Sequence, residues 1–582
     1  MKARVLWKRL KEFSRYYWPH RNLLVIDMIA GVSQSALTVI LPLVVYEIFQ
    51  TYLPAMAFDK IIWAGVVMLV LALLISAADY VGIRWGHSLG VRMEADMRRD
   101  LFAHLQKLSF SYFDRNQTGQ IMSRISNDLT QIAEIAHHCP EDMLIATLTM
   151  SGAFVVMMFL NPTLTLVALI LVPVIIAWGW AFQGRMHRGF REVRKKVGDL
   201  NNQVANAIQG IREVRSYCNE DLEIECFSNV NDRFKNTREN IYGVMAGFHS
   251  GMMFLMQCYS LLFVIAGAIL MYYKVATMAE ILVFTMYARY FTMPIFRLVG
   301  FVEQFQQGST AFERFAEVLD EAPEITDPAR PIAPATLRGE IVFDHVSFRY
   351  PGMSDEIPLV LDDVSLQIPP GKTVALVGES GAGKTTLASL ISRFYEVSGG
   401  SVSIDGVDVK QMSQQFLRSQ VGVVRQTPFL FDTTIGENIR FGRDNATTEQ
   451  ILEAAQQANI RDFIQDLPEG LNAPVGEHGV KLSGGQCQRI SLARIFLKDP
   501  KILVFDEATS SLDNESEALV QQAIARLCAG RTTVVIAHRL STVRNADYIY
   551  SMRAGKIVEA GTHEELLKLG GYYHKLYTLH SF

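Results

Sequence analysis

A glycine-rich segment with one lysine has the residue types and spacing that most directly indicate chemistry. The segment GESGAGKTT, residues 378–386, follows the apolar run TVALV and precedes TTLASLISRFY. It matches G-x-x-x-x-G-K-[ST] in the strand–loop–helix context in which that pattern binds phosphate. Its glycines let backbone N–H groups surround phosphate oxygens, and the helix that follows adds positive potential. We expect ATP contacts from Gly378, Glu379, Ser380, Gly381, Ala382, Gly383, Lys384, Thr385 and Thr386, with Lys384 on the β- and γ-phosphates and Thr385 on Mg²⁺.

A second group of polar residues follows two buried strands. ILVFDE, residues 502–507, is an apolar run that ends in two carboxylates, and such a run predicts a strand buried on both faces. Ligands of open α/β sheets bind beyond the carboxyl ends of the strands. Asp506 is therefore placed to hold Mg²⁺, and Glu507 to act as the base on an attacking water. A third run, TTVVIA, precedes His538; a lone histidine is more often structural, but the phosphate loop in the same domain favours a γ-phosphate contact.

The pentapeptide LSGGQ, residues 482–486, indicates a second phosphate-binding surface. Ser483 and the backbone N–H groups of Gly484 and Gly485 stand ahead of a predicted helix, and Gln486 completes the motif. The motif lies far along the chain from the first phosphate loop. Two phosphate-binding surfaces in one domain suggest that they meet across a dimer.

The elements that position these motifs are those of an α/β domain. Short β-branched runs alternate with helical patterns after the proline-rich stretch DPARPIAPATLRG, residues 327–339. Proline-rich stretches of this kind mark loops between structured segments. We therefore expect a linker at 326–338 and an ATP-hydrolysing domain at 339–582.

Apolar runs long enough to cross a membrane occupy the first half. A spanning helix needs roughly 20 residues, and we expect such helices at about 22–53, 61–84, 142–160, 163–183, 247–272 and 277–300, in a domain covering 1–325. The connections after the second and fourth runs are long and basic, which places them in the cytoplasm. The predicted fold class is a six-helix all-α transmembrane domain followed by an α/β P-loop ATPase domain. We expect a multi-pass protein of the bacterial plasma membrane with its ATPase domain in the cytoplasm.

The composition agrees with two such halves and excludes some classes of function. The 582 residues are too many for one core, and 49% hydrophobic with 20% charged residues indicates a membrane half joined to a soluble half. The six cysteines are scattered, which argues against a disulfide framework or a cysteine metal site. The spanning runs argue against a soluble ATPase that acts on DNA or ribosomes, so we expect no nucleic-acid partner.

Charged residues inside the apolar runs give a hint about what the membrane half contacts. Glu47 and Asp79 lie near predicted helix ends, whereas Arg289 lies near mid-membrane. Charge in lipid is costly and usually faces a cavity or a partner. Glu280 lies roughly 13 Å away along the same helix and cannot pair with Arg289 locally. We expect Arg289 to contact an acidic group of a transported substrate, with a structural pair to Glu47 or Asp79 as the alternative.

Two features of the first half leave alternatives open. The segment 113–132, FDRNQTGQIMSRISNDLTQI, is either a docking element for the ATPase domain or an ordinary helical corner. A set of methionine and aromatic residues either lines an adaptable cavity or makes ordinary helix and lipid contacts, which is the commoner case. The set is Met157, Met158, Met252, Met253, Phe254, Met256, Tyr287, Tyr290 and Phe291.

Together these motifs resemble the ATP-binding cassette (ABC) transporter family, specifically exporter-type half-transporters, over nearly the whole chain. GESGAGKT resembles the Walker A motif, ILVFDE the Walker B motif and LSGGQ the family signature. The resemblance implies that Tyr350 in FRYP stacks on adenine, and that Gln426 in VVRQTPFLF is the Q-loop glutamine, a Mg²⁺ ligand and catalytic residue. Lys384, Glu507 and His538 complete the implied catalytic set.

Further matches and two departures complete the resemblance, the departures being Cys487 and the second serine of SSLD, where an alanine is common. Glu477 in VGEHGVKLSGGQ matches a loop that contacts the membrane domain, and Asp513 in SSLD matches the D-loop. The segment YFDRNQTGQIMSRISND, residues 112–128, resembles the first intracellular loop of the exporters. Cys487 follows the signature where a basic or polar residue is common, which does not put catalysis in doubt.

The resemblance also implies a mechanism and its partners. Two half-transporters, preferably identical although a heterodimer is possible, would sandwich two ATP molecules, each between one P-loop and the opposite LSGGQ. Closure would turn the membrane domains from inward- to outward-facing within the lipid bilayer and export or flip an amphipathic or hydrophobic lipid, drug or peptide. The alternatives are an exporter-fold importer and an ATP-gated channel or receptor, and the intact Glu507 argues against the channel.

Overall fold

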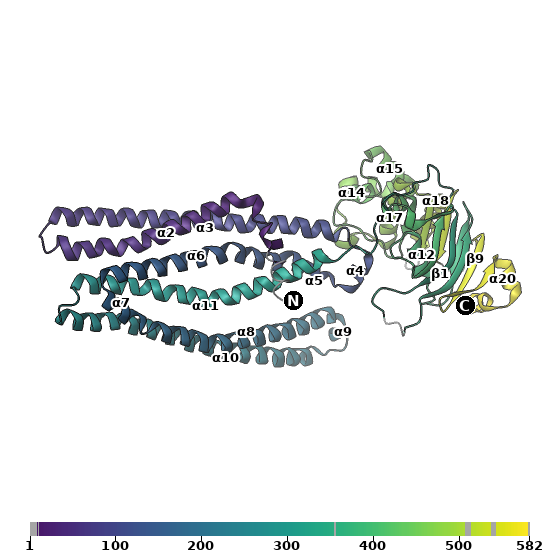
Figure 1. Ribbon diagram of the computed structural model, residues 1–582. Helices are drawn as coiled ribbons and strands as arrows, with labels where there is room; N and C mark the ends of the chain where they lie inside the picture. The colour runs from purple at the N-terminus through teal and green to yellow at the C-terminus, as the bar shows by residue number, and fades with distance from the viewer. Residues whose placement is uncertain (1–8, 10, 354–356, 507–513, 537–542, 580–582) are drawn as a thin grey trace. The chain divides into compact units, whose positions relative to one another are not determined.

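Figure 1 shows the computed structural model, which describes residues 9, 11–353, 357–506, 514–536 and 543–579. Within these ranges, nothing is described of the side chains at 168, 292, 293, 295–303, 306 and 478. The contacts divide the chain into two compact units. The first comprises Met1–Gln106 with Thr118–Glu321, and the second comprises Lys107–Gln117 with Ala322–Phe582.

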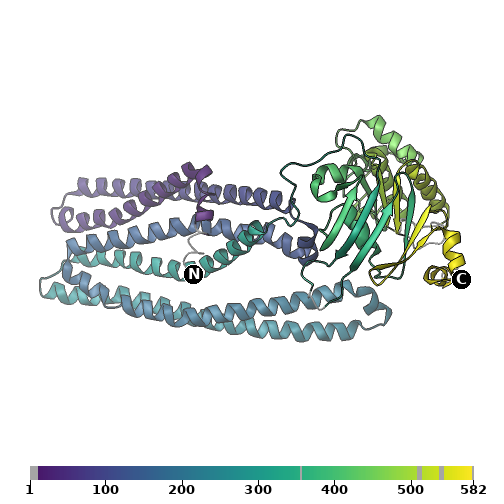
Figure 2. The ribbon, with the colours of Figure 1, turned by 45° about the vertical axis from the view of Figure 1, so that its right-hand side comes forward.

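The first unit consists of long helices, with shorter ones at their ends. The long ones are α2 (Arg21–Glu47), α3 (Phe58–Leu105), α6 (Leu129–Leu160), α8 (Val172–Gln209), α10 (Glu220–Tyr272) and α11 (Met278–Asp320). The shorter ones are η1 (Trp18–His20), η2 (Ile48–Tyr52), α5 (Thr118–Ser123), η3 (Arg124–Asp128), α7 (Pro162–Leu169) and α9 (Ile211–Ser216). Helices α8 and α10 run side by side along their length in both views (Figures 1 and 2).

Five helical stretches of the described residues are long and apolar enough to cross a membrane. They are Lys11–Tyr52, Phe58–Leu105, Thr118–Leu160, Pro162–Gln209 and Glu220–Tyr272. The sixth predicted run, 277–300, lies in α11, where several side chains fall outside the description. Helices α3, α8 and α10 continue far beyond the predicted spans, so the membrane limits at 61–84, 163–183 and 247–272 stay predictions.

The sharp turn between α6 and α7 follows from the sequence Asn161-Pro162. The Asn161 side chain accepts hydrogen bonds from the backbone N–H groups of Thr163 and Leu164, at 3.1 Å each, and thereby caps α7. Pro162 occupies the first helical position, where its missing N–H costs nothing. The Asn161 amide also donates to the carboxylate of Glu280 at 3.0 Å. Glu280 is thus engaged at the start of α11.

The predicted helix 163–183 is two helices in the structure. Helix α7 ends at Leu169 and α8 begins at Val172. Pro173 lies in the first turn of α8, and proline cannot donate the hydrogen bond that would continue a helix from the preceding turn. The helix is therefore interrupted between Leu169 and Val172, inside the fourth apolar run.

The core of the first unit favours packing over a cavity for part of the methionine and aromatic set. Met157, Met252, Tyr287 and Phe291 are buried in one cluster with Tyr259. Met158, Met253 and Phe254 are exposed on the surface of the single chain. Tyr290 borders the cavity described below.

The second unit is built on two sheets. A six-stranded sheet has the order β10-β9-β3-β8-β7-β6, in which only β10 is antiparallel to its neighbour, and a four-stranded antiparallel sheet has the order β2-β1-β4-β5. The strands are β1 (Ile341–Phe348), β2 (Leu361–Ile368), β3 (Thr373–Val377), β4 (Gly399–Ile404), β5 (Val407–Asp408), β6 (Val421–Val424), β7 (Ile502–Asp506), β8 (Thr532–Ile536), β9 (Tyr548–Arg553) and β10 (Lys556–Gly561).

Each face of the six-stranded sheet packs on a different set of elements. Successive side chains of a strand point to opposite faces, so Val374 and Leu376 of β3 enter one core and Ala375 and Val377 the other. The first core holds the antiparallel sheet, α12 (Lys384–Ile391) and α13 (Gln414–Gln420). The second holds α14 (Ile435–Arg440), α15 (Thr448–Gln457), α16 (Arg461–Asp466), α17 (Gly484–Lys498), α18 (Asn514–Cys528), α20 (His563–Leu569) and α21 (Tyr572–Leu579).

Candidate nucleotide site

The predicted phosphate loop connects β3 to α12 and needs glycine at two positions for steric reasons. A Cβ on Gly378 would lie 2.2 Å from the carbonyl oxygen of Met552. Gly383 has φ of +96°, and a Cβ there would lie 2.7 Å from Cδ2 of Leu361. Glycine tolerates both the left-handed backbone and the close approach. The sequence thus folds the loop tightly against β9 and β2, with its N–H groups ahead of α12.

Lys384 is held inside this loop. Its side chain is buried, and Nζ donates to the carbonyl oxygens of Gly378 at 2.7 Å and Glu379 at 2.9 Å. The hydroxyl of Thr385 belongs to an exposed residue, whereas Thr386 is buried. The Thr386 Oγ1 and the Tyr350 hydroxyl form a hydrogen bond of 2.9 Å. Thr385 therefore offers an exposed hydroxyl of the kind that a metal ligand needs, while Thr386 holds Tyr350.

Tyr350 stands at the edge of this loop among aromatic rings. Its ring lies edge-on to Phe348 and Tyr395, with centroids 5.0 Å and 5.2 Å away. The side chain is half-buried. One hydrogen bond and two edge-on ring contacts hold the Tyr350 ring in place. The stacking of this ring on adenine stays a prediction.

The sheet brings the other described candidates to the same edge. Strands β3, β8, β7 and β6 are parallel and adjacent, so their carboxyl ends meet where the phosphate loop begins. Asp506 is the last residue of β7, level with Ile536 of β8. Gln426 is exposed two positions beyond β6. Three further candidates, Glu507, Asp513 and His538, lie outside the described residues.

The LSGGQ motif forms the start of α17. Ser483 caps the helix in a capping box: its Oγ accepts from the Gln486 N–H at 3.3 Å, and the Gln486 side chain accepts from the Ser483 N–H at 2.8 Å. Ser483 and Gly484 are exposed. A Cβ on Gly485 would lie 2.6 Å from Cβ of Ser516. The motif therefore presents an exposed N-terminus of a fifteen-residue helix, with Gln486 acting in its cap.

Arg494 is a structural member of the site that the sequence analysis missed. It lies on α17 and donates to the carbonyl oxygens of Phe429 and Asn438, at 2.6 Å each. Its guanidinium also lies over the rings of Phe431 and Phe441. Burial lowers the pKa of Arg494 to about 10, so it remains a cation at neutral pH. The signature helix α17 thereby holds the loop that follows Gln426. This contact joins segments that are distant in the sequence, so no local motif indicates it.

Cys487 is one of the two departures from the family pattern. It follows the LSGGQ motif on α17 and is buried. Its thiol donates to the carbonyl oxygen of Gly479 at 3.7 Å. Burial raises the pKa of the Cys487 thiol, which keeps it neutral and unreactive. Cys487 is therefore a core residue of the second unit.

The docking alternative is supported for the start of the segment 113–132. Helix α4 (Phe110–Arg115) belongs to the second unit by its contacts. The Phe110 ring lies 4.6 Å from that of Phe394 and 6.5 Å from that of Tyr395. The Tyr395 hydroxyl donates to the carboxylate of Asp114 at 2.6 Å, and burial, together with this contact, raises the pKa of Tyr395. The chain between α3 and α6 thus contributes a helix to the ATPase unit.

A second contact fixes the other side of α4. Arg115 pairs with Glu324 at 3.1 Å, and Ser111 donates a hydrogen bond to the same carboxylate. The Ser109 hydroxyl accepts from the N–H of Ile325 at 3.1 Å. Residues 324 and 325 begin the connection to the ATPase domain, so α4 is anchored to that connection as well as to Phe394 and Tyr395.

The residues of the site fit ATP and Mg²⁺. The glycine loop and the start of α12 offer backbone N–H groups to phosphate, and Lys384 offers a cation. Thr385, Asp506 and Gln426 offer the oxygen ligands that Mg²⁺ prefers. Asp506 and Gln426 stand at the carboxyl ends of neighbouring strands.

Comparisons with known proteins identify both halves. The family model described as "ABC transporter transmembrane region" matches residues 24–295, and the one described as "ABC transporter" matches residues 361–510. A relative from Bacillus subtilis, the uncharacterized ABC transporter ATP-binding protein YwjA, is 41% identical over 98% of this chain and 98% of its own. The chain belongs to the ABC transporter family.

Two further comparisons indicate the type of ABC transporter. The putative multidrug export ATP-binding/permease protein YgaD of Bacillus subtilis is 34% identical over 98% of this chain and 99% of its own. The structure of a bacterial Atm1-family ABC exporter with ATP bound superposes with a TM-score of 0.81, at 26% identity over 97% of this chain and 99% of that one. This ABC transporter is an exporter-type half-transporter that couples ATP hydrolysis to transport. It is a multi-pass membrane protein with a cytoplasmic ATPase domain.

In the membrane half of the transporter, Arg289 borders a cavity of about 370 Å³. The cavity is lined from α2, α6 and α11 by Gln34, Ser35, Thr38, Ile145, Ala146, Thr149, Met286, Arg289, Tyr290 and Pro294. Hydroxyl and amide groups share the lining of this cavity with Arg289, and the Ser35 hydroxyl is buried with no hydrogen-bond partner among the described residues. Asp79, one predicted alternative partner of Arg289, accepts a hydrogen bond from Gln34 at 3.0 Å.

Proposed function

We propose that the chain works as a dimer of half-transporters, preferably of two identical chains, with two ATP molecules bound between them. The supporting observation is that α12 and α17 lie in the two different cores on opposite faces of the six-stranded sheet. The phosphate loop and the LSGGQ end of one chain are therefore held in different layers of its own fold. A second chain supplies the LSGGQ surface that each phosphate loop lacks.

The phosphate loop and the strand ends divide the work of nucleotide binding. ATP supplies the free energy of phosphoryl transfer to water. The loop N–H groups and Lys384 bind the phosphates, and Tyr350 supports the adenine. Thr385, Gln426 and Asp506 hold Mg²⁺.

Glu507 and His538 carry the proton transfer and the γ-phosphate contact. Glu507 follows Asp506 at the end of β7, where a carboxylate can accept the proton of the attacking water. His538 donates to the γ-phosphate. Ser483 of the opposite chain completes the site, and its Oγ accepts from Gln486 while its own O–H proton stays available to a phosphate oxygen.

In this mechanism, helix α4 transmits the movements of the ATPase domains to the membrane helices. Closure of the ATPase domains moves α4, which joins α3 to α6 through α5 and η3, and the membrane domains alternate between inward- and outward-facing. The transported compound is an amphipathic or hydrophobic drug, lipid or peptide that leaves the cytoplasm. The relative named for multidrug export supports this class. An exporter-fold importer and an ATP-gated channel are the alternatives.

Arg289 binds an acidic group of that compound. The cavity beside Arg289 has both apolar and polar lining residues: Ile145 and Met286 are apolar, and several others carry hydroxyl groups. Such a lining suits an amphipathic anion. The cation draws a carboxylate, sulfonate or phosphate group out of the lipid. This assignment supports a preference for anionic amphiphiles over cationic ones.

Transport by the reconstituted full chain tests this function and its direction. Proteoliposomes with outward-facing ATPase domains should accumulate the anionic dye 8-anilinonaphthalene-1-sulfonate when ATP and Mg²⁺ are added outside, and Glu507→Gln should abolish accumulation. Loss of dye from preloaded vesicles under the same conditions indicates an importer. A dye flux that equilibrates with ATP but continues in Glu507→Gln contradicts the pump.

The role of Arg289 requires transport and stability to be measured together. Arg289→Ala should keep its melting temperature and basal ATPase activity and lose stimulation by 8-anilinonaphthalene-1-sulfonate, whereas rhodamine 6G, a cationic amphiphile, should act equally on both proteins. Arg289→Lys is the matched control, because it retains the charge. A fall in stability that Glu47→Gln or Asp79→Asn reverses would show a structural pair instead.

A further inference from the structure

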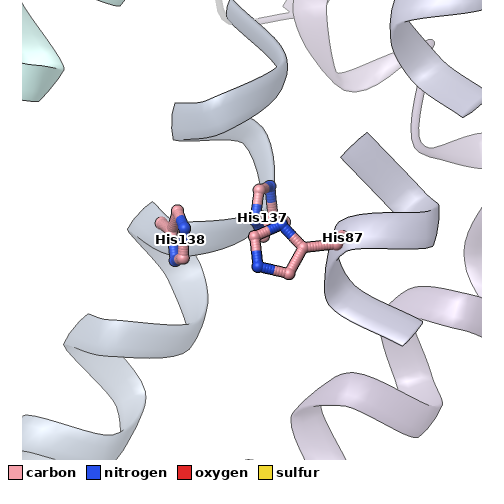
Figure 3. A group of neighbouring side chains, drawn as sticks. All are labelled: His87, His137 and His138. Carbon is pink, nitrogen blue, oxygen red and sulfur yellow. The ribbon is translucent and has the colours of Figure 1, made fainter. Parts of the chain in front are cut away.

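Three histidine rings gather between α3 and α6, a few residues on the cytoplasmic side of the predicted spans 61–84 and 142–160. His87 comes from α3, and His137 and His138 come from α6 (Figure 3). One ligand atom from each of the three lies within 4.8 Å of the other two. The ring of His137 lies 4.5 Å from that of His87 and 4.1 Å from that of His138, between centroids. The nucleotide site uses none of these residues.

His137 has a buried nitrogen lone pair. The residue is 2% exposed, and its Nδ1 lies 3.0 Å from the carbonyl oxygen of Ala133. A carbonyl oxygen can only accept, so Nδ1 carries the hydrogen and, in the neutral ring, Nε2 carries the lone pair. Nε2 is buried with no hydrogen-bond partner among the described residues. A buried polar atom without a partner is uncommon and calls for an unseen ligand.

The surroundings of the other two rings suit ligands of the same ion. Nε2 of His138 lies 3.5 Å from the Glu134 carboxylate, so the acidic group stands behind one side of this ring. Carboxylates and carbonyls behind the rings of metal-binding histidines orient them in this way. His87 is exposed and offers a path for an ion to enter.

A buried carboxylate next to the cluster favours a cation. Asp27 of α2 is fully buried, and neither of its carboxylate oxygens has a hydrogen-bond partner among the described residues. A Cβ on Gly86 would lie 3.0 Å from Oδ1 of Asp27, and a Cβ on Gly90 would lie 2.9 Å from Nδ1 of His137. The two glycines are one turn apart on α3, about 6 Å. An unpartnered carboxyl group and the buried imidazole therefore flank the same short stretch of α3.

We propose that His87, His137 and His138 bind a divalent transition-metal ion of the class that prefers imidazole, such as Zn²⁺, Ni²⁺ or Co²⁺, with Asp27 balancing its charge. Imidazole nitrogens favour these ions over Mg²⁺ and Ca²⁺, which prefer oxygen. Zinc–nitrogen bonds are about 2.0–2.1 Å long, so binding draws the rings closer by small side-chain rotations. The ion joins α3 to α6. The proposal does not depend on the nucleotide site or on the direction of transport.

Metal titration of the full-length protein without a histidine tag tests the site. After removal of bound metal with a chelator, calorimetry with Zn²⁺ should give about one ion per chain, and Co²⁺ should give visible absorption bands of a nitrogen-ligated ion. His87→Ala combined with His138→Ala should weaken Zn²⁺ binding by at least about tenfold, with basal ATPase activity unchanged. His187→Ala, which removes an exposed histidine elsewhere on α8, should bind Zn²⁺ as the parent does. Equal affinity in the parent and the double variant overturns the proposal.

Two further measurements test the site if substitutions at the buried His137 destabilise the protein. Zn²⁺ should raise the melting temperature of the parent and of His187→Ala, and leave that of His137→Gln unchanged; an equal rise in His137→Gln contradicts the site. Zn²⁺ affinity should also fall as the pH is lowered from about 7 to about 5, because imidazole with an ordinary pKa of about 6.5 must lose its proton to bind metal. An affinity that does not change over this range contradicts histidine ligation.

Discussion

Lys384 lies buried in the phosphate loop, with its ammonium group bonded to two carbonyl oxygens of the same loop. The fold therefore positions the cation. The ammonium group of Lys384 needs to move only a short way to bind phosphate oxygens in place of the two carbonyl oxygens. Thr385, beside it, is exposed. At the scale of single residues, the cation and the hydroxyl that we assign to phosphate and Mg²⁺ lie in the first turn of α12, and the remaining question is which group activates water.

The first prediction concerns the general base. Glu507→Gln should retain ATP binding, because the amide keeps the size of the carboxylate, and should lose turnover by roughly 10²–10⁴-fold, because it cannot accept a proton. Steady-state ATPase rates and nucleotide retained on the purified protein check the two halves of this prediction. Hydrolysis at near the parent rate would show that another group is the base.

The second prediction concerns cysteine reactivity. Cys218 and Cys226 are exposed, whereas Cys487 is buried, and burial raises the pKa of the thiols of Cys487 and Cys528. Because the thiolate is the reactive form, brief alkylation near pH 7 should modify Cys218 and Cys226 first and Cys487 and Cys528 last. Peptide mass spectrometry measures the order, and rapid modification of native Cys487 would contradict its place in the core.

At the scale of elements, helix α17 connects several parts of the ATPase domain. Its first residues form the LSGGQ end, Arg489 donates to the carbonyl oxygen of Asn459 at 2.8 Å, and Arg494 holds the chain at Phe429 and Asn438. The signature end is therefore connected through α17 to the loop after Gln426. Helix α4 is anchored within the ATPase unit on Tyr395 and Glu324.

The third prediction concerns Arg494. Arg494→Ala leaves the part-buried carbonyl oxygen of Asn438 without this donor, at a cost of about 1–3 kcal/mol in protein stability, and should lower ATPase activity by displacing the loop that carries Gln426. Arg494→Lys keeps the charge but not the forked geometry, and should be intermediate. Thermal unfolding and ATPase rates are the measurements. An Arg494→Ala protein with parental stability and activity would contradict this role.

The fourth prediction concerns the docking of α4. Tyr395→Phe removes the hydrogen bond to Asp114, worth about 0.5–1.5 kcal/mol, and should weaken the coupling of transport to hydrolysis while basal ATPase activity persists. Tyr273→Phe, which removes the same group from an exposed ring, is the matched control. The number of ATP molecules hydrolysed per dye molecule transported should rise in Tyr395→Phe, and an unchanged ratio would contradict the coupling role.

The sequence predicted the motifs of these elements better than their contacts. The glycine loop, the carboxylate after β7 and the capping LSGGQ segment depend on residues adjacent in the chain, so their pattern is visible in the sequence. The pairs Tyr395–Asp114 and Arg494–Phe429 join distant positions and carry no local signal. Asp27, a buried charge in the first apolar run, was missed, and the break before Pro173 was not anticipated.

At the scale of the whole molecule, each unit contains one part of the proposed transport cycle. The ATPase unit carries a phosphate loop on one face of its sheet and a signature helix on the other. The membrane unit carries long helices and the cavity beside Arg289. Pairing two chains would complete both nucleotide sites at once, and α4 would carry their closure to α3 and α6.

Cross-linking between subunits at the nucleotide site tests this claim most directly. Two full-length chains with different affinity tags, one with Ser380→Cys and one with Ser483→Cys, would be combined in a background with the six native cysteines replaced and with Glu507→Gln to retain ATP. Both positions are exposed. As a control, placing both new cysteines on one chain beside a cysteine-free partner should give no linked dimer. We predict a covalent dimer carrying both tags that forms with a short thiol-specific linker when ATP and Mg²⁺ are present, whereas no linked dimer, or an equal yield without ATP, would contradict the shared site.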